Sequence, residues 1–393
     1  MRILHVATAW PREPGDVITP WLVALVERQA DRGHEVEVLT SSWRGIGDQA
    51  WDGVPIRRFR YAPARWERLT HEEAAADRLE RSPAMALWVP AYVGGGMTRG
   101  WRLGRRRRFE VVHVHWVVPH GPIGWAAARG AGDTALVTTF YAAEIRFAER
   151  RFPPAKRFLR WWCRRSRLIA ISESTKEMLR PYAGDAPIEV IPYGVPTPAV
   201  PPSSATPGEE PLLLFVGRLV ARKGVDRLIE ALATLGERPW RLEVIGFGPE
   251  RERLESLAAR HGLGDRIVFR GRVSEEALVD AYRRADLFVL PATVDERSDT
   301  EGLGVVLLEA MAAATPVVAT RRGGIVDVVV DGETGLLVDD RIDALARGIG
   351  RLLDDPNIAR AMGERGAERV RRAFGWDTIL DRLEAVYERG PSG

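Results

Sequence analysis

Two carboxylates stand eight positions apart in the segment DTEGLGVVLLEAMA, residues 299–312. Glu301 lies among glycines, and Glu309 is the only charged residue between Leu303 and Val318. Such apolar surroundings cost a carboxylate on the order of several kcal/mol unless a partner satisfies it. Two interpretations are equally open. Either the pair holds the two ends of one elongated ligand, or Glu309 pairs with a core arginine while Glu301 is solvated.

A second group of candidate residues is cationic. The segment GRLVARKG, residues 217–224, follows an apolar run, so that Gly217 ends a strand and a helix begins beyond it. Arg218 and Lys223 would flank the helix N-terminus, where two cations and the backbone dipole favour a diphosphate. Lys223 is also the only lysine after residue 200, and a compact ammonium suits a closely approached phosphate. A solvated basic turn is the alternative, and the context favours the diphosphate site.

Two further segments can complete a nucleotide pocket. EVIGFGPE places Gly246 and Gly248 in a turn after a strand, and FRGRVSEEAL predicts that Ser274 caps a helix. Together they can seat a planar base against the backbone near Val273.

The elements that must position these residues are strands alternating with helices. The predicted strands cover residues 2–8, 35–41, 109–116, 135–140, 167–172 and 188–192, and then 211–217, 241–246, 265–271, 286–292, 315–320 and 335–338. Continuous apolar strands separated by helices indicate parallel sheets covered on both faces. We expect two Rossmann-like, doubly wound α/β domains facing each other across a cleft. Ligands of such sheets bind beyond the carboxyl ends of the strands.

The length and composition agree with this architecture. A chain of 393 residues exceeds one compact core, and its 45% apolar and 28% charged residues are typical of soluble globular proteins. No apolar run reaches the roughly 18–20 residues of a membrane span, and MRILHVATAW resembles a buried strand more than a signal peptide. The single cysteine excludes an internal disulfide, so we expect a cytoplasmic protein. A Pro/Ser-rich linker, 197–211, separates a domain at 1–196 from one at 212–375. Neither half shows the G-x-G-x-x-G turn of NAD enzymes after its first strand.

The charge is distributed unevenly. Residues 1–200 carry 30 Lys+Arg against 21 Asp+Glu, and the remainder carries 27 against 33. Two segments concentrate the basic residues: RGWRLGRRRRFE, with six arginines in 99–110, and KRFLRWWCRR, 156–165. Buried packing beneath a solvated basic face is slightly favoured for the second segment. The alternative is a helix that touches an anionic membrane surface. No nucleic-acid motif accompanies the charge, so nucleic acid is not expected as a partner.

Candidate residues of the first half lie in loops after strands. Gly15 and Asp16 belong to the loop WPREPGD, and HVHWVVPHG places His120 in another loop. His113 and His115 alternate onto one strand face. Strand packing is favoured over a zinc site there, because no acidic or cysteine partner lies at ligand spacing.

The ordered set GRLVARKG, EGLGVVLLE and TPVVATRRGGIVDVVVDGETGLLV resembles the retaining glycosyltransferases of family 4, which have the GT-B fold. IAISESTKEML, IEVIPYGV and FGWDTILDRLEAVY extend the resemblance over nearly the whole chain. It implies transfer of a sugar from a nucleotide diphosphate donor with retention of anomeric configuration, without a cofactor or metal. It also implies that the closing segment, 376–393, is a helix crossing back to the first domain.

The resemblance assigns roles by position. Arg218 and Lys223 bind the diphosphate, Glu309 takes the ribose hydroxyls and Glu301 holds the sugar hydroxyls. The amides of Gly302, Leu303 and Gly304 reach the donor sugar and phosphate. Acceptors in this family bind mainly to the first domain.

One position departs from the family pattern. Similar proteins often read T-x-H-G-x-D after a strand of the first domain, with the histidine near the donor sugar. This chain reads TTFYAAEI, with Tyr141 at the histidine position and Glu144 at the acidic one.

The expected function is transfer of a hexose from a nucleotide diphosphate sugar, a UDP-sugar before GDP-mannose, to a glycan or lipid-linked acceptor. Peripheral attachment to the inner face of the membrane is compatible with it. The alternatives are a nucleotide-sugar epimerase or a phosphorylase of the same fold, and a non-catalytic module that binds the donor.

Overall fold

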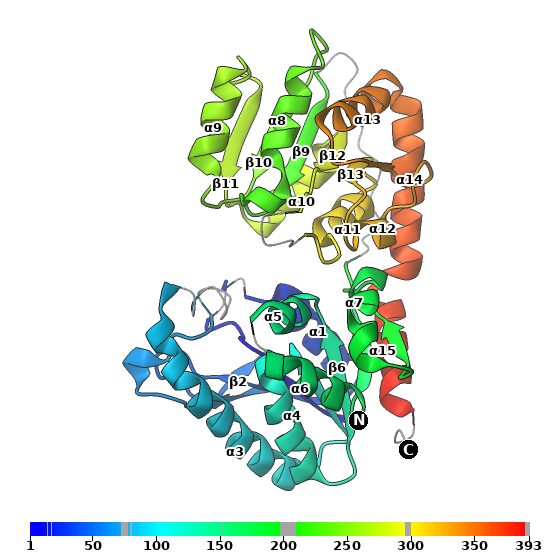
Figure 1. Cartoon of the computed structure of the whole chain (residues 1–393). Coiled ribbons are helices and arrows are strands. Elements are labelled where there is room, and N and C mark those ends of the chain that lie inside the picture. The colour runs from blue at the N-terminus through cyan, green and yellow to red at the C-terminus, as the bar shows by residue number, and fades with distance from the viewer. Residues whose placement is uncertain are drawn as a thin grey trace. The chain divides into compact units, whose positions relative to one another are not determined.

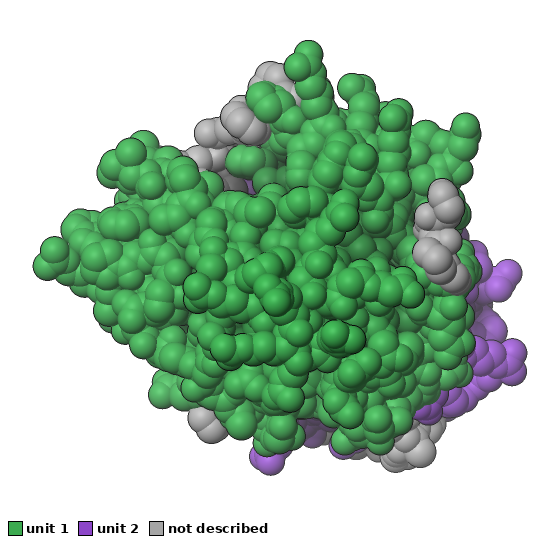
Figure 2. Space-filling view, turned by 90° about the horizontal axis from the view of Figure 1, so that it is seen from below, with its two compact units in different colours: residues 1–192, 380–393 green, residues 193–379 purple. Residues whose placement is uncertain are grey.

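The computed structural model describes residues 1–13, 15, 16, 18–71, 78, 81–151, 153–196, 210–294 and 300–389. The chain forms two compact units (Figures 1 and 2). Unit 1 comprises Met1–Pro192 and Leu380–Gly393, and unit 2 comprises Tyr193–Ile379. Most of the predicted linker, residues 197–209, lies outside the described part of the chain.

Unit 1 is built on a sheet whose described strands have the order β3-β4-β2-β1-β5-β6-β7-β8. All neighbours pair in parallel except β3 and β4. The strands are β1 (Arg2–Val6), β2 (Glu35–Ser41), β3 (Gln49–Trp51), β4 (Val54–Phe59), β5 (Val111–His115), β6 (Ala135–Phe140), β7 (Arg167–Ala170) and β8 (Ile188–Val190).

Helices connect the strands of this sheet, and one further helix joins unit 1 from the end of the chain (Figure 1). They are α1 (Pro20–Asp31), α3 (Val89–Arg107), α4 (Val117–Ala131), α5 (Ala143–Arg151), α6 (Pro153–Cys163), α7 (Glu173–Ala183) and, from Leu380 onward, α15 (Trp376–Glu388), with 3₁₀ turns η1 (Ala64–Trp66) and η2 (Pro83–Trp88). Helix α7 begins after Ser172, whose hydroxyl accepts the Thr175 amide at 3.1 Å and so caps the helix.

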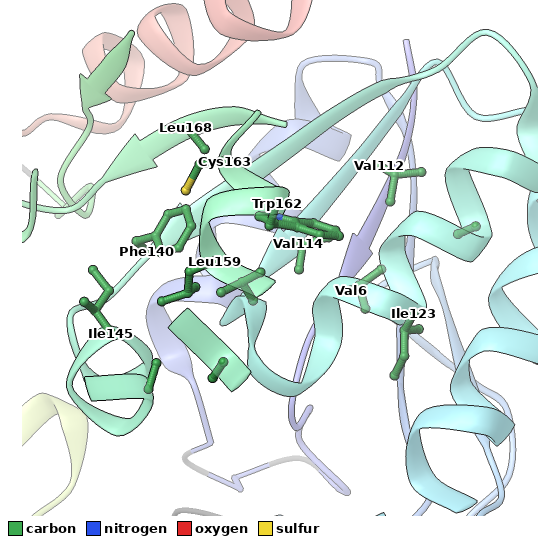
Figure 3. Packing of buried hydrophobic residues seen from close by; sticks show 14 of the residues in the cluster. Val6, Val112, Val114, Ile123, Phe140, Ile145, Leu159, Trp162, Cys163 and Leu168 are labelled. Atoms are coloured by element: carbon green, nitrogen blue, oxygen red, sulfur yellow. The ribbon is translucent and has the colours of Figure 1, made fainter. Parts of the chain in front are cut away.

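The core of unit 1 answers one of the open questions about the segment at 156–165. Leu159, Trp162 and Cys163 of α6 are buried and pack with strand residues such as Phe140 (Figure 3). The side chain of Trp161, by contrast, keeps 38% of its surface exposed. The helix therefore combines a core face with an exposed tryptophan.

Unit 2 contains a sheet of parallel strands in the order β11-β10-β9-β12-β13-β14. The strands are β9 (Leu212–Val216), β10 (Arg241–Ile245), β11 (Ile267–Gly271), β12 (Leu287–Leu290), β13 (Val317–Thr320) and β14 (Leu336–Val338). The helices are α8 (Val225–Ala233), α9 (Arg251–Arg260), α10 (Glu275–Arg284), α11 (Val305–Ala312), α12 (Ile325–Val328), α13 (Ile342–Asp354) and α14 (Pro356–Ala373), with the 3₁₀ turn η3 (Ala221–Lys223). Apolar spacing explains α8, which buries Val225, Leu228, Ile229 and Leu232 on one face.

The two parallel α/β units confirm the predicted fold class. The hairpin β3–β4 was not predicted, although Asp52-Gly53 between two short β-prone runs is a hairpin signal. Both central residues adopt a positive φ, as a tight turn of this kind requires.

Candidate functional site

The predicted donor residues gather where the strand order of unit 2 reverses direction. From β9 the chain proceeds to β10 on one side, while β12 pairs with β9 on the other. This is the switch point at which open parallel sheets bind ligands. The loops after the two strands are joined there, because the Thr293 amide donates to the Arg222 carbonyl at 2.9 Å.

Lys223 and Glu301 form an ion pair at this switch point. The ammonium of Lys223 donates to Glu301 Oε2, and both side chains are largely buried. Burial disfavours the ionised carboxyl of Glu301. This effect is outweighed by the charge and hydrogen bond of Lys223, by the nearby charge of Arg222 and by the Gly304 amide. The pKa of Glu301 therefore lies below its ordinary value. Glu301 is thus an ionised acceptor held inside the protein.

The cations of the loop after β9 differ in their surroundings. Arg218 is exposed, whereas Lys223 is buried. Sequence reasoning missed Arg222, whose Nη1 lies 3.7 Å from Glu301 Oε2. The sequence could have suggested Arg222, because this residue directly precedes Lys223 in GRLVARKG.

The glycines after β10 have a structural reason to be glycine. The loops after β9 and β10 pair through the Gly217 amide and the Ile245 carbonyl at 3.0 Å. A Cβ atom at Gly246 would lie 1.8 Å from the Gly217 carbonyl oxygen, and one at Gly248 would lie 2.2 Å from that of Leu219. The close approach of the two loops therefore favours glycine at both positions.

The loop that carries Glu301 ends at helix α11. Gly304 occupies the position before the helix with φ of 87°, a conformation that favours glycine. Gly302 and Leu303 precede it, and the Glu301 carbonyl accepts the Gly324 amide at 3.1 Å. A Cβ atom at Gly324 would lie 2.1 Å from the Gly302 carbonyl oxygen. The glycine pair in TRRGG thus supports the loop.

Glu309 has a partner that the sequence did not suggest. Tyr282 of α10 donates its phenolic O–H to Glu309 Oε2 at 2.7 Å. Burial raises the pKa of Glu309, while this hydrogen bond opposes the change. The partner found is therefore a tyrosine and not the core arginine of the alternative interpretation. Ser274 caps α10 as predicted, accepting the Ala277 amide at 3.2 Å, and Val273 lies half-buried just before it.

In unit 1, Asp16 is held by Arg12. The guanidinium of Arg12 donates to both carboxylate oxygens, at 2.6 and 3.0 Å, and the Arg12 amide donates at 3.0 Å. Burial opposes ionisation of Asp16, but these contacts lower its pKa below the ordinary value. Gly15 is exposed with φ of 86°. Pro14 and Val17 of the same loop lie outside the described residues.

Tyr141 and Glu144 lie together after β6. Tyr141 is buried against the rings of Trp21 and Trp116, and its amide donates to Glu144 Oε1 at 3.0 Å. Glu144 Oε2 is buried without a hydrogen-bond partner in the described structure. Burial raises the pKa of Glu144 to about 7. The carboxyl group of Glu144 therefore changes its protonation near pH 7.

A cluster of buried histidines adjoins Tyr141. His5 of β1 faces His113 of β5 in register, and potential ligand atoms of His5, His113 and His115 lie within 4.8 Å of one another. All six ring nitrogens already hydrogen-bond to protein groups, including His115 Nδ1 to the Tyr141 hydroxyl at 2.6 Å. Burial lowers the pKa of each histidine, that of His5 to about 4. We therefore interpret the cluster as a neutral hydrogen-bonded group.

His120 does not lie in a loop, as the sequence suggested, but in α4. It is fully buried and hydrogen-bonds to the Tyr92 hydroxyl and the Trp116 carbonyl, both at 3.0 Å. Burial lowers its pKa to about 4. The structure thus gives His120 two internal partners.

Comparison with known proteins agrees with these features. Family models described as "Glycosyltransferase Family 4" and "Glycosyl transferases group 1" match residues 21–198 and 197–369. The chain is 30% identical to a GDP-mannose-dependent alpha-(1-6)-phosphatidylinositol monomannoside mannosyltransferase of Mycobacterium tuberculosis, over 99% of this chain and 98% of that protein. It is 33% identical to a D-inositol 3-phosphate glycosyltransferase of Kineococcus radiotolerans, over 98% and 94%.

Solved structures show the same fold. Sucrose-phosphate synthase from Thermosynechococcus elongatus aligns with a TM-score of 0.78 at 24% identity, over 99% of this chain and 98% of that one. HepE of Anabaena, in complex with UDP and glucose, aligns with a TM-score of 0.69 at 19% identity, over 99% and 100%. With this fold and these full-length relatives, the chain belongs to glycosyltransferase family 4 and has the GT-B fold.

Proposed function

We propose that this glycosyltransferase transfers mannose from GDP-mannose, with retention of configuration, to a lipid-linked or other hydroxyl-bearing acceptor. The observation that carries the donor site is the Lys223–Glu301 ion pair at the switch point of unit 2. GDP-mannose is preferred over a UDP-sugar because full-length relatives with 30 and 31% identity are named for it.

In the proposed mechanism the donor separates Lys223 from Glu301, and each then contacts a different part of the donor. The diphosphate takes the ammonium of Lys223 and the exposed guanidinium of Arg218, which stabilise the charge on the leaving group. Glu301, released from Lys223 and kept ionised by its low pKa, accepts hydroxyl groups of the sugar. Glu309 accepts ribose hydroxyls beside Tyr282. A donor phosphate oxygen takes the acceptor proton on the face from which the diphosphate leaves. These cations and carboxylates suffice in this scheme, so we propose that no metal takes part.

Helices α3, α4 and α6 support a membrane-bound acceptor. Together they contain nine Lys or Arg residues and no Asp or Glu. Trp101 and Trp161 are exposed by 42% and 38%, and each lies against an arginine of its own segment. Tryptophan beside arginine is typical of surfaces that contact anionic lipid headgroups. Within the described residues, no helix is long and apolar enough to cross a bilayer. We propose that unit 1 attaches peripherally to an anionic membrane through these helices.

The donor is tested by thermal unfolding with GDP, UDP and ADP, because a ligand of the folded state raises its stability by mass action. We expect GDP to give the largest rise, and transfer assays with GDP-mannose to yield an α-linked product by NMR of the anomeric proton. A larger rise with UDP would show that the donor is a UDP-sugar and not GDP-mannose. Binding of the donor without transfer or hydrolysis would favour the non-catalytic module.

A further inference from the structure

Seven buried side chains of unit 1 form one continuous hydrogen-bonded chain that ends at Tyr141. The chain passes from Tyr141 to His115 at 2.6 Å, then to His5 at 2.9 Å and to Gln29 at 2.7 Å. From Gln29 it continues to Tyr387 at 3.2 Å, to His113 at 2.8 Å and to Thr139 at 2.8 Å.

The contributing residues come from five elements and are all buried. His5 lies on β1, His113 and His115 on β5, Gln29 on α1, Thr139 on β6 and Tyr387 on α15, while Tyr141 directly follows β6. None of the seven exceeds 7% exposure. In such surroundings a donor or acceptor without a partner is costly, so each bond strongly constrains the next.

If the rings are neutral and the Tyr387 hydroxyl accepts one bond and donates the other, the chemistry of the groups allows two arrangements of the protons. A neutral imidazole donates through one nitrogen and accepts through the other, and a hydroxyl that accepts one bond can donate the next. If Gln29 Oε1 accepts from His5, then His5 Nδ1 accepts from His115 and His115 Nδ1 accepts from Tyr141. On the other branch Gln29 Nε2 donates to Tyr387, which donates to His113.

Turning the Gln29 amide by half a turn reverses every bond. His5 then accepts from Gln29 and donates to His115, and His115 donates to the Tyr141 oxygen. The two directions share one signature. In the first, all three histidines carry the proton on Nε2, and in the second all three carry it on Nδ1.

We propose that these seven side chains act as one unit in which Gln29 couples both branches. The direction in which the hydrogen bonds run then decides whether Tyr141 donates a hydrogen bond to His115 or accepts one from it. His115, His5 and Gln29 are then positioning residues for the Tyr141 hydroxyl. As a consequence, Tyr141 can meet a hydroxyl of a sugar ligand either as acceptor or as donor. This assignment of a sugar ligand rests on the proposed function, whereas the coupling of the chain does not.

The decisive experiment is solution NMR of the histidine ring nitrogens in the whole protein, because the ¹⁵N shifts distinguish the two neutral tautomers and the charged ring. We expect His5, His113 and His115 to be neutral at pH 7 and to share one tautomer. A mixed set of tautomers, or a charged ring among the three, would overturn the proposal whatever the enzyme activity.

A second experiment addresses Tyr141 through a residue remote from it in the chain. Tyr387→Phe removes the link between Gln29 and His113. Tyr182→Phe is the matched control, since Tyr182 is a buried phenol outside the seven and its hydroxyl donates to Glu149 at 3.1 Å. We expect Tyr387→Phe to end the shared tautomer and to lower kcat about fivefold with unchanged donor KM. The control should change neither quantity. Equal behaviour of the two variants in both readouts would contradict the coupling.

Discussion

Lys223, after β9, and Glu301, after β12, are 78 residues apart in the chain and form an ion pair at the switch point of unit 2. The pair brings into contact the cation that we assign to the diphosphate and the ionised carboxylate that we assign to the sugar hydroxyls. In the proposed donor complex each group contacts a different part of the sugar nucleotide, so each can be tested by its own substitution.

Replacing Lys223 by Ala should weaken GDP binding about 10- to 150-fold, because one charge-assisted contact contributes about 1.5–3 kcal/mol. Arg218→Ala should weaken it similarly. Lys223→Ala should in addition lower the midpoint temperature, since it removes the nearer of the two cations, Lys223 and Arg222, that face the buried Glu301 carboxylate. Isothermal titration calorimetry measures the binding. Lys176→Ala, a half-buried lysine of α7 that pairs with Glu173, is the control. Unchanged GDP affinity in both site variants would refute the diphosphate assignment.

The two glutamates should separate by the part of the donor that each binds. Glu309→Gln should weaken binding of the free nucleotide, because the nucleotide contains the ribose. Glu301→Gln should leave nucleotide affinity near that of the wild type and lower transfer about 10- to 150-fold, as expected for a lost charged hydrogen bond. Titration calorimetry with GDP and steady-state transfer assays give the two quantities. An equal loss of GDP affinity in both variants would show that the assigned orientation of the donor is wrong.

Tyr141→Phe should lower turnover about tenfold while GDP affinity stays the same, because one neutral hydrogen bond is lost and the phenol does not serve as a base. The hydroxyl accepts or donates a single bond in the buried chain with His115. Turnover and donor hydrolysis are measured in parallel. If both match the wild type, Tyr141 serves packing alone.

Glu144 should make stability depend on pH in a defined window. Its pKa is raised by burial from 4.5 to about 7, so the folded protein retains a proton that the unfolded chain loses. This contribution is complete below pH 4.5 and decreases by about 1.4 kcal/mol per pH unit as the pH rises towards 7. Glu144→Gln abolishes it.

The depressed pKa values of the buried histidines act in the opposite direction, because their contribution is lost as the pH falls below 6.5. The wild type and the Glu144→Gln variant contain the same histidines, so this contribution cancels when the stabilities of the two are compared. The midpoint temperature of Glu144→Gln minus that of the wild type should therefore rise between pH 5 and 7. Glu177→Gln, an exposed glutamate of α7, serves as the control. A difference independent of pH would exclude the raised pKa.

The proposed membrane surface predicts binding to anionic vesicles that declines with added salt, since screening weakens exposed charges. Replacing Trp101 and Trp161 by Gln should reduce co-sedimentation with vesicles containing phosphatidylserine several-fold. Trp66→Gln, an exposed tryptophan of η1, should not. Absence of binding at low salt, or equal loss in the control, would exclude this surface.

The sequence by itself determined the α/β class and most elements of the proposed donor site. Strands β9, β10 and β12 are continuous apolar runs, and the residues that follow them are local in sequence. In a parallel sheet all these strand ends share one edge, so the pattern alone places Lys223, Gly246 and Glu301 in one neighbourhood. Gly304 and Ser274 likewise mark the starts of α11 and α10, because capping depends on residues near in sequence.

Only the tertiary structure decided which of these groups are in contact. Nothing local relates Glu309 to Tyr282, because their hydrogen bond depends on the packing of α11 beside α10. The histidine alternation on β5 was visible in the sequence, but His5 and Gln29 complete it from other elements. Tyr387 joins from 274 residues beyond His113. A buried polar group must find its partner wherever the fold brings one, and that search is not confined to neighbours in the chain.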